Sequence, residues 1–329
     1  MKKKFKAFIS YQNQNGYFEN KIILKSFNEL PNADLLIKVK YSSLNYKDAL
    51  SATGSKGVTK HYPHTPGIDA AGIIVKSKNS YFKTNDRVIV TGFDLGMNTS
   101  GGFAEYIQVS SSWVIKCPDS LSLKEAMMIG TAGLTAGLCV HEIENHTKIK
   151  NLKVIVSGAT GGVGSIAVML LSYLGAKVTS ITGKENTDSY LHDLGSSEII
   201  NRDHFVNSTR LPLNRGNYDA AVDVVGGNIL SSIIASMTYN GIITVCGNVA
   251  NPKFSTSVFP FILRKNRLIG IDSASNPIDD KKKIWNKFSS SWQLNNLNQL
   301  VKIINLDSLD REIKKILCGE QIGRVVVQL

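Results

Sequence analysis

The chain has 329 residues, of which 43% are hydrophobic and 19% are charged, an ordinary composition for a folded protein with one or two apolar cores. Its net charge of +12 leaves open an anionic partner (nucleic acid, a phosphorylated cofactor or a CoA-type substrate) or lysines simply scattered over the surface. The longest basic runs, 1–4 and 281–283, are not interleaved with aromatic residues, so we expect no nucleic-acid partner.

Cysteine usage and hydropathy bear on the compartment. The four cysteines are far apart and form no C-x-x-C pair, which is typical of thiols in a reducing compartment. The N-terminus shows no export signal, and no uninterrupted apolar run approaches the roughly 20 residues that a membrane span requires. We therefore expect a cytoplasmic protein without a membrane-spanning segment.

Short β-rich runs dominate the chain up to about residue 118. Turn residues separate them, notably Pro66-Gly67 and Gly101-Gly102, which predicts a small, closed β structure. The predicted strands here include 35–40, 72–75 and 86–90.

The sequence pattern then changes to alternating strands and helices, which predicts a doubly wound parallel sheet with helices on both faces. After this stretch the chain returns to helix and ends in a strand at 324–327. The fold class is therefore α/β, with a β-rich unit at 1–121 and 273–329 and a Rossmann unit at 122–272. The predicted strands of the Rossmann unit are 154–156, 177–182, 197–200, 219–225 and 241–245, and its predicted helices include 166–174 and 186–194.

A glycine-rich loop, Ser157-Gly158-Ala159-Thr160-Gly161-Gly162-Val163-Gly164, lies between an apolar strand and an amphipathic helix. Small residues in this place let backbone amides approach a pyrophosphate at the positive end of the helix. Ala159 replaces the first glycine of the usual fingerprint. The loop predicts dinucleotide binding, and the alternative is an ordinary tight turn.

The end of the second Rossmann strand indicates which dinucleotide. NAD-specific folds place an acid there to accept hydrogen bonds from the ribose 2′-hydroxyl. This chain has Thr182-Gly183-Lys184, a hydroxyl, a glycine and a cation that suit a 2′-phosphate, and Arg202 could reach the same phosphate. We therefore predict NADPH over NADH, the alternative being a turn with an exposed lysine.

The sequence predicts no metal site and no covalent hydrolase. The histidines form neither an H-E-x-x-H nor a paired C-x-x-C/H-x-x-H pattern, and His61 and His64 flank Pro63 in an expected surface turn. No G-x-S-x-G or S-x-x-K motif is present.

Four motifs together resemble the medium-chain dehydrogenase/reductase superfamily over essentially the whole chain. They are the segments 66–72, 101–106 and 130–136 and then the glycine loop, and they occur along the chain in the same order as in the family. Zinc alcohol dehydrogenases of that superfamily carry Gly-His-Glu where this chain has Gly67-Ile68-Asp69, and a cysteine in the loop where it has residues 44–48. The resemblance is thus to the zinc-free branch.

Within that branch, the segments 42–50, 127–133 and 259–264 resemble the acrylyl-CoA reductase group, often labelled quinone oxidoreductases. The resemblance implies a GroES-like β-rich catalytic domain, a Rossmann domain and a homodimer. It also implies NADPH contacts at Tyr46, Thr160, Gly161, Gly162, Val163, Thr182, Gly183, Lys184, Val224 and Leu268.

The implied reaction is NADPH-dependent reduction of an activated carbon–carbon double bond, such as acrylyl-CoA to propionyl-CoA. Without a metal, hydrogen-bond donors must stabilise the enolate that forms. We predict that Tyr46 lines the nicotinamide pocket, that Asn45 donates to the carbonyl, and that Asp48 orients the loop; for Tyr46 the alternative is core packing. Two other functions stay open: reduction of a quinone or a free enal, and a regulatory or RNA-binding protein that uses NADPH as a ligand.

Overall fold

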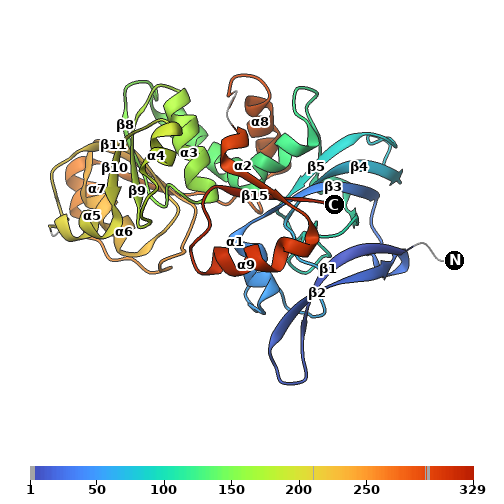
Figure 1. Ribbon diagram of the computed structural model, residues 1–329. Coiled ribbons are helices and arrows are strands. Elements are labelled where there is room, and N and C mark those ends of the chain that lie inside the picture. The colour runs from blue at the N-terminus through green and yellow to red at the C-terminus, as the bar shows by residue number, and fades with distance from the viewer. Residues whose placement is uncertain (1–3, 210, 293, 295–296) are drawn as a thin grey trace. The chain divides into compact units, whose positions relative to one another are not determined.

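The computed structural model describes residues 4–209, 211–292, 294 and 297–329, which form two compact units (Figure 1). Unit 1 comprises Met1–Thr131, Ala274–Ser291 and Asn295–Leu329, and unit 2 comprises Ala132–Ser273 and Trp292–Leu294. The first boundary lies inside helix α2 (Leu123–His146), whereas we predicted it before this helix, between residues 121 and 122.

Unit 1 contains the predicted β structure. Its main sheet has the strand order β14-β15-β3-β4-β5-β7, with β6 beside β3, and the hairpin β1–β2 forms a separate small sheet. Along β3 (Leu35–Leu44), Leu35, Ile37 and Val39 are buried while Lys38 is exposed, the alternation expected of a strand with one face on a core. The β-rich character predicted for this part of the chain is thus confirmed.

The other elements of unit 1 are short and connected by turns. The strands are β1 (Lys4–Gln12), β2 (Phe18–Ser26), β4 (Asp69–Ser77), β5 (Arg87–Thr91), β6 (Tyr106–Val109), β7 (Val114–Lys116), β14 (Val301–Ile304) and β15 (Arg324–Gln328), and the helices are α1 (Tyr46–Ala52), α8 (Ile278–Phe288) and α9 (Leu309–Leu317). Short 3₁₀ turns lie at Phe27–Glu29, Ser111–Trp113, Leu297–Leu300 and Leu306–Ser308.

Unit 2 is the predicted doubly wound sheet. Its strands are parallel and follow the order β10-β9-β8-β11-β12-β13. Helices α3 and α4 cover one face, and α5, α6 and α7 cover the other (Figure 1). The strand order reverses between β8 and β11, so a crevice is expected there, at the carboxyl ends of the strands.

The bounds in unit 2 agree with the predicted elements to within a few residues, and β9 agrees at both ends. The strands are β8 (Lys153–Val156), β9 (Lys177–Thr182), β10 (Ser196–Asn201), β11 (Tyr218–Asp223), β12 (Met237–Val245) and β13 (Arg267–Gly270), and the helices are α3 (Gly162–Tyr173), α4 (Asp188–Asp193), α5 (Arg202–Ser208), α6 (Gly227–Ala235) and α7 (Phe259–Arg264).

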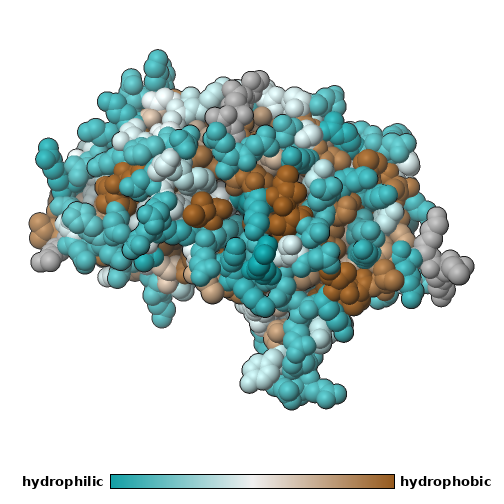
Figure 2. Space-filling model, in the orientation of Figure 1, coloured by the Kyte–Doolittle hydropathy of each residue, from teal (hydrophilic) through white to brown (hydrophobic). Residues whose placement is uncertain are grey.

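Helix α2 is the one described helix that is long and apolar enough to cross a membrane. Its apolar window is 83% buried inside the protein, and its backbone leaves the helical conformation at Gly130 (φ 52°, ψ −159°). This degree of burial is typical of a helix in a protein core. The face of the protein in Figure 2 is mostly hydrophilic, with hydrophobic residues in separate small patches.

Candidate functional site

The glycine loop of unit 2 is folded back tightly at the start of α3. Gly158 has φ +56°, and a Cβ there would lie 2.7 Å from a Val224 methyl group. A Cβ on Gly164 would lie 2.3 Å from the carbonyl oxygen of Gly158. These contacts explain why glycine stands at both positions. They bring the loop, through Gly161 as N-cap, onto the amino end of a twelve-residue helix, where amides and the helix dipole favour an anion.

The residues predicted to bind the 2′-phosphate lie at or near the end of β9, beside this loop. The hydroxyl oxygens of Thr160 and Thr182 are 3.5 Å apart, and Thr182 also accepts a hydrogen bond from the backbone of Lys184. Gly183 lies under the guanidinium of Arg202, whose Cζ is 2.8 Å from where a Cβ would be. Partial burial lowers the pKa of Lys184. The end of β9 thus has the Thr182 hydroxyl and the Arg202 guanidinium close to Gly183, with Lys184 the next residue along the chain.

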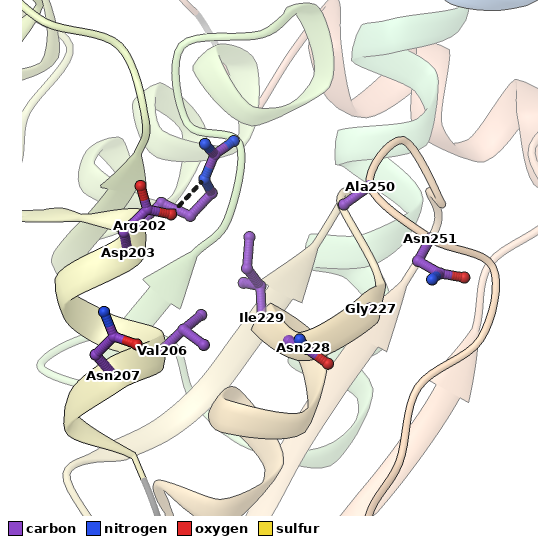
Figure 3. A pocket seen from close by; sticks show the side chains of 9 residues that line it. All are labelled: Arg202, Asp203, Val206, Asn207, Gly227, Asn228, Ile229, Ala250 and Asn251. Atoms are coloured by element: carbon purple, nitrogen blue, oxygen red, sulfur yellow. Dashed lines mark hydrogen bonds and ion pairs between the residues drawn. The ribbon is translucent and has the colours of Figure 1, made fainter.

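Next to Arg202 the structure has a cleft of about 420 Å³ at the carboxyl ends of the strands. The side chains of Val206 and Ile229 face it from α5 and α6, while Arg202 pairs with Asp203 at its rim, 3.2 Å away (Figure 3). An apolar slot beside a cationic group could hold the flat base of a dinucleotide. Its full lining is Arg202, Asp203, Val206, Asn207, Gly227, Asn228, Ile229, Ala250 and Asn251.

Two further predicted cofactor residues have different surroundings. Val224 follows β11 directly and packs against the glycine loop. Leu268 lies within β13, opposite Ile243, and packs against the hydrophobic core of the unit. The structure therefore brings Val224, but not Leu268, into contact with the loop.

In unit 1, the predicted catalytic residues are found where β3 ends and α1 begins. Tyr46 is the first residue of α1 and is half-buried; among the described residues nothing is hydrogen-bonded to its hydroxyl. Asp48 closes the first turn by accepting from the backbone of Asn45 (2.8 Å), and its other oxygen accepts from the backbone of Ile68 (2.7 Å). Asp48 therefore fixes the start of α1 against the segment that precedes β4.

Asn45 is buried, and both ends of its amide are engaged. Its nitrogen donates to the carboxylate of Asp69 at 2.8 Å and lies 3.2–3.3 Å from Asp48 and the Ser43 carbonyl. Its oxygen accepts from Arg324 at 3.1 Å. These contacts leave the amide no free hydrogen for a substrate carbonyl, so they favour a positioning function over the predicted donation.

Arg324, the first residue of β15, joins this network from the far end of the sequence. Its guanidinium is fully buried and donates to Asn45, to Ser43 Oγ (2.8 Å) and to the carbonyls of Leu44 and Met128 (3.2 and 3.3 Å). The sequence reasoning did not identify Arg324. The sequence feature that could have identified it is an arginine at the start of an otherwise apolar strand, Arg324-Val325-Val326-Val327.

Asp69 is the acidic centre of the same network. It accepts from Ser43, Asn45 and Thr131, and one of its oxygens lies 3.9 Å from Arg324. Burial and the nearby Asp69 carboxylate raise the pKa of Asp48 to about 7, against three hydrogen bonds that lower it. For the Arg324 guanidinium, burial has the opposite effect and lowers the pKa, because it disfavours the charged form. Two carboxylates therefore share one buried cation.

The residues of this network do not fit a zinc ion. Asp69 stands at the motif position where zinc alcohol dehydrogenases have the acid of Gly-His-Glu, but its partners are hydroxyls, an amide and a guanidinium instead of Cys and His. The Arg324 cation would repel a second cation there. Within the described residues no group of three or more His, Cys, Asp or Glu side chains could hold a metal ion.

Comparison with known proteins identifies the family of the chain. A family model described as alcohol dehydrogenase GroES-like domain matches residues 31–119, and one described as zinc-binding dehydrogenase matches residues 162–290. The Bacillus subtilis protein named "Putative quinone oxidoreductase YhfP" is 40% identical over 306 residues, which cover 92% of this chain and 93% of YhfP. Acrylyl-CoA reductase AcuI of Ruegeria pomeroyi is 34% identical over 305 residues, 92% of each chain.

Two solved structures are similar over nearly their whole length. The yhdH oxidoreductase of Salmonella enterica in complex with NADP has a TM-score of 0.94 and 36% identity, covering 98% of this chain and 99% of its own. Bacillus subtilis yhfP with NAD bound has a TM-score of 0.96 and 38% identity, covering 99% and 100%. The predicted GroES-like and Rossmann architecture is confirmed.

Proposed function

Because the chain belongs to the medium-chain dehydrogenase/reductase family and is an oxidoreductase of that family, we propose that it reduces an activated carbon–carbon double bond with NADPH. The proposed reaction is the conversion of acrylyl-CoA to propionyl-CoA, by analogy with the relative that bears the name acrylyl-CoA reductase. The observation that carries the cofactor choice is the end of β9, where Thr182 and Lys184 flank Gly183 and the Arg202 guanidinium packs against it.

These residues suit the 2′-phosphate of NADPH for an electrostatic reason. A phosphate monoester is a dianion at neutral pH, and charge-assisted hydrogen bonds to Arg or Lys are about twice as strong as neutral ones. Glu185, the nearest acid in sequence, is exposed one residue beyond Lys184. Because a relative was solved with NAD bound, NADH is the competing cofactor, and the preference for NADPH over NADH must be measured.

The glycine loop would hold the pyrophosphate through the backbone of Thr160, Gly161, Gly162 and Val163 at the amino end of α3. Val224 would contact the dinucleotide across the loop, and the cleft between α5 and α6 would receive the adenine. When bound, NADPH supplies a hydride that adds to the β-carbon of the double bond, while the displaced electron pair moves onto the thioester oxygen and a proton is added at the α-carbon.

The chain's own residues would organise that step from unit 1. Tyr46, whose hydroxyl has no hydrogen bond within the described part of the chain, would contact the nicotinamide or substrate and donate a hydrogen bond to the enolate oxygen. Asn45 and Asp48 would act as positioning residues, because their polar atoms are used to fix the first turn of α1 beneath Tyr46. The reaction is proposed to need no zinc, since the Asp69 network already holds its own cation.

A homodimer is the proposed assembly, in the cytoplasm. β13 is the last strand of its sheet, so one edge of its backbone is unpaired among the described residues. Four apolar side chains of the neighbouring segment, Val258, Phe259, Ile262 and Leu263, are exposed. A second copy could pair along this edge and cover them.

A second acceptor class is supported by a specific observation, the 40% identity to a protein named as a quinone oxidoreductase. The same fold and cofactor serve either acceptor, because fold does not determine substrate. A quinone or a free enal is therefore the alternative substrate. A regulatory or RNA-binding protein that holds NADPH without turnover is the alternative of another class.

The deciding experiment follows NADPH absorbance with purified protein and acrylyl-CoA, a 1,4-quinone or a free enal as acceptor, with NADH in parallel. Rapid oxidation of NADPH with acrylyl-CoA and slow oxidation with the other acceptors supports the thioester reductase. Preference for the quinone or enal moves the function to the second class. Tight NADPH binding without turnover on any acceptor refutes both reductases and favours the ligand-sensing protein.

A further inference from the structure

A buried carboxylate lies at the point where the strand order of unit 2 reverses. Asp223, the last residue of β11, is fully buried, and among the described residues no lysine, arginine or histidine pairs with it. Its two oxygens accept from Ser157 Oγ at 2.6 Å and from the backbone amides of Gly226 (2.9 Å) and Val225 (3.4 Å). Burial raises its pKa, so the hydrogen bonds are what keep the charged form tolerable.

Ser157 is the first residue of the glycine loop, and its hydroxyl is used twice. It donates to Asp223 and accepts from the backbone amide of Val224 at 3.0 Å. Ser157 thus ties the loop after β8 to the loop after β11 by a closed pair of hydrogen bonds. Both residues have no exposed surface, so neither can touch a ligand directly.

The spacing that this pair maintains is unusually small. The glycine loop lies so close to the end of β11 that a Cβ on Gly158 would meet the methyl groups of Val224 and Val225 at 2.7 and 2.9 Å. A Cβ on Gly247 would in turn lie 2.2 Å from the carbonyl oxygen of Val224. A loop held at this distance presents its amides in one arrangement, and loss of the tie would let it move away.

The same strand carries a second aspartate that serves as an internal comparison. Asp219 lies near the start of β11 and accepts from the backbone of Lys153 in β8 (2.9 Å) and from Thr238 in β12 (3.0 Å). It ties neighbouring strands as Asp223 does, but at the amino end of the parallel sheet. Dinucleotides bind at the carboxyl ends, so Asp219 should matter for stability alone.

We propose that Ser157 and Asp223 form a latch that positions the glycine loop for the dinucleotide, so that Asp223 sets cofactor affinity without touching the cofactor. The proposal rests on the proposed function only in that a dinucleotide must bind the loop. In this arrangement Asp223 is a positioning residue, acting through Ser157 and the amides of residues 224–226.

The test measures the dissociation constant for NADPH by titration calorimetry, together with thermal unfolding of the same preparations. Ser157→Ala and Asp223→Ala are expected to raise that constant about tenfold or more, the size of a lost hydrogen bond to a charged group. In steady-state assays the KM for NADPH should rise while kcat at saturating NADPH changes much less. Asp223→Asn keeps one carbonyl oxygen for Ser157 and should lose less affinity than Asp223→Ala.

Asp219→Ala is the matched control and should lower thermal stability while leaving NADPH affinity near that of the unmodified protein. The latch is refuted if Asp223 and Ser157 variants bind NADPH normally, or if Asp219→Ala weakens binding as much. Should Asp223→Ala fail to fold, Ser157→Ala and Asp223→Asn decide the question. If the unmodified protein binds no dinucleotide, the proposed function itself fails; normal binding with unaffected variants overturns only the latch.

Discussion

Replacing Arg324 with methionine should destabilise the protein strongly, because it removes the buried cation beside Asp69. The guanidinium has 2% exposed surface and donates to Ser43, Leu44, Asn45 and Met128. Asp69, 3.9 Å away and with no exposed surface, would lose this buried cation as a neighbour. Methionine fills much of the volume but donates nothing to these acceptors.

The magnitude follows from the geometry. Removing one partner of a buried ion pair costs about 3–5 kcal/mol, since an uncompensated buried charge is left behind. For a cooperative unit of this size each kcal/mol lowers the melting temperature by about 2–4 °C, so we expect a decrease of about 6–20 °C. Arg324→Lys should lie between, because an ammonium keeps the charge but cannot reach all four acceptors with a planar fork.

The assays are urea unfolding, for the free energy, and thermal unfolding, for the melting temperature, both at neutral pH and with Arg311→Met as the control. Arg311 also pairs with an acid, Glu312 at 3.2 Å, but its side chain is 64% exposed, and Lys302 would still hold Glu312 at 2.7 Å. Pairs with an exposed cation contribute about 0–1 kcal/mol, and Glu312, although buried, keeps Lys302 as a partner, so this variant should stay near the unmodified protein. Equal, small losses for Arg324→Met and Arg311→Met would refute the view that the Asp69 network depends on Arg324.

Three further variants test other parts of the site. Lys184→Glu should lower kcat/KM for NADPH relative to NADH by about 10- to 100-fold, because it removes one charge-assisted hydrogen bond and adds a repulsion. Lys177→Glu, at the exposed start of β9, should leave this ratio unchanged. Gly164→Ala should weaken NADPH binding, measured by calorimetry, because its Cβ meets the Gly158 carbonyl at 2.3 Å, while Gly57→Ala, where the nearest atom is 4.0 Å away, should leave binding intact. The pKa of Asp48 is raised from 3.8 to about 7, so the folded state binds this proton more tightly than the unfolded state. The free energy of unfolding should therefore fall as pH rises from about 4 to about 7. This decrease should be smaller in Asp48→Asn, and parallel pH curves for the two proteins would contradict the prediction.

The Rossmann unit was predictable because its signals are local. An apolar strand, a glycine loop and an amphipathic helix follow one another within residues 153–173, and the cofactor-selecting residues end the next strand. Parallel order then brings the strand ends to one edge, so neighbours in the motif become neighbours in space. Arg202 against Gly183 follows from the same logic, since β10 pairs with β9.

The network of unit 1 was not predictable in this way, because its members are separated along the chain. Arg324 and Ser43 are 281 positions apart, and Asp69 and Thr131 are 62 apart. No spacing rule links an arginine at the start of a terminal strand to an asparagine before a short helix. From the sequence we predicted only that Asp48 orients its loop. The structure adds its hydrogen-bond partners, the backbone amides of Asn45 and Ile68.

The glycine at the kink of α2 shows how such a network constrains sequence at a distance. A Cβ on Gly130 would lie 2.6–2.7 Å from Ser43 Oγ, Arg324 Nη2 and Asp69 Oδ2 at once, and its φ of 52° disfavours other residues in any case. The kink turns the backbone of Thr131 so that its amide and hydroxyl both donate to Asp69. A metal ion organises its ligands by charge; here a guanidinium and a helix kink supply the charge and the donors, so the loop that carries Tyr46 can be held in place by side chains alone.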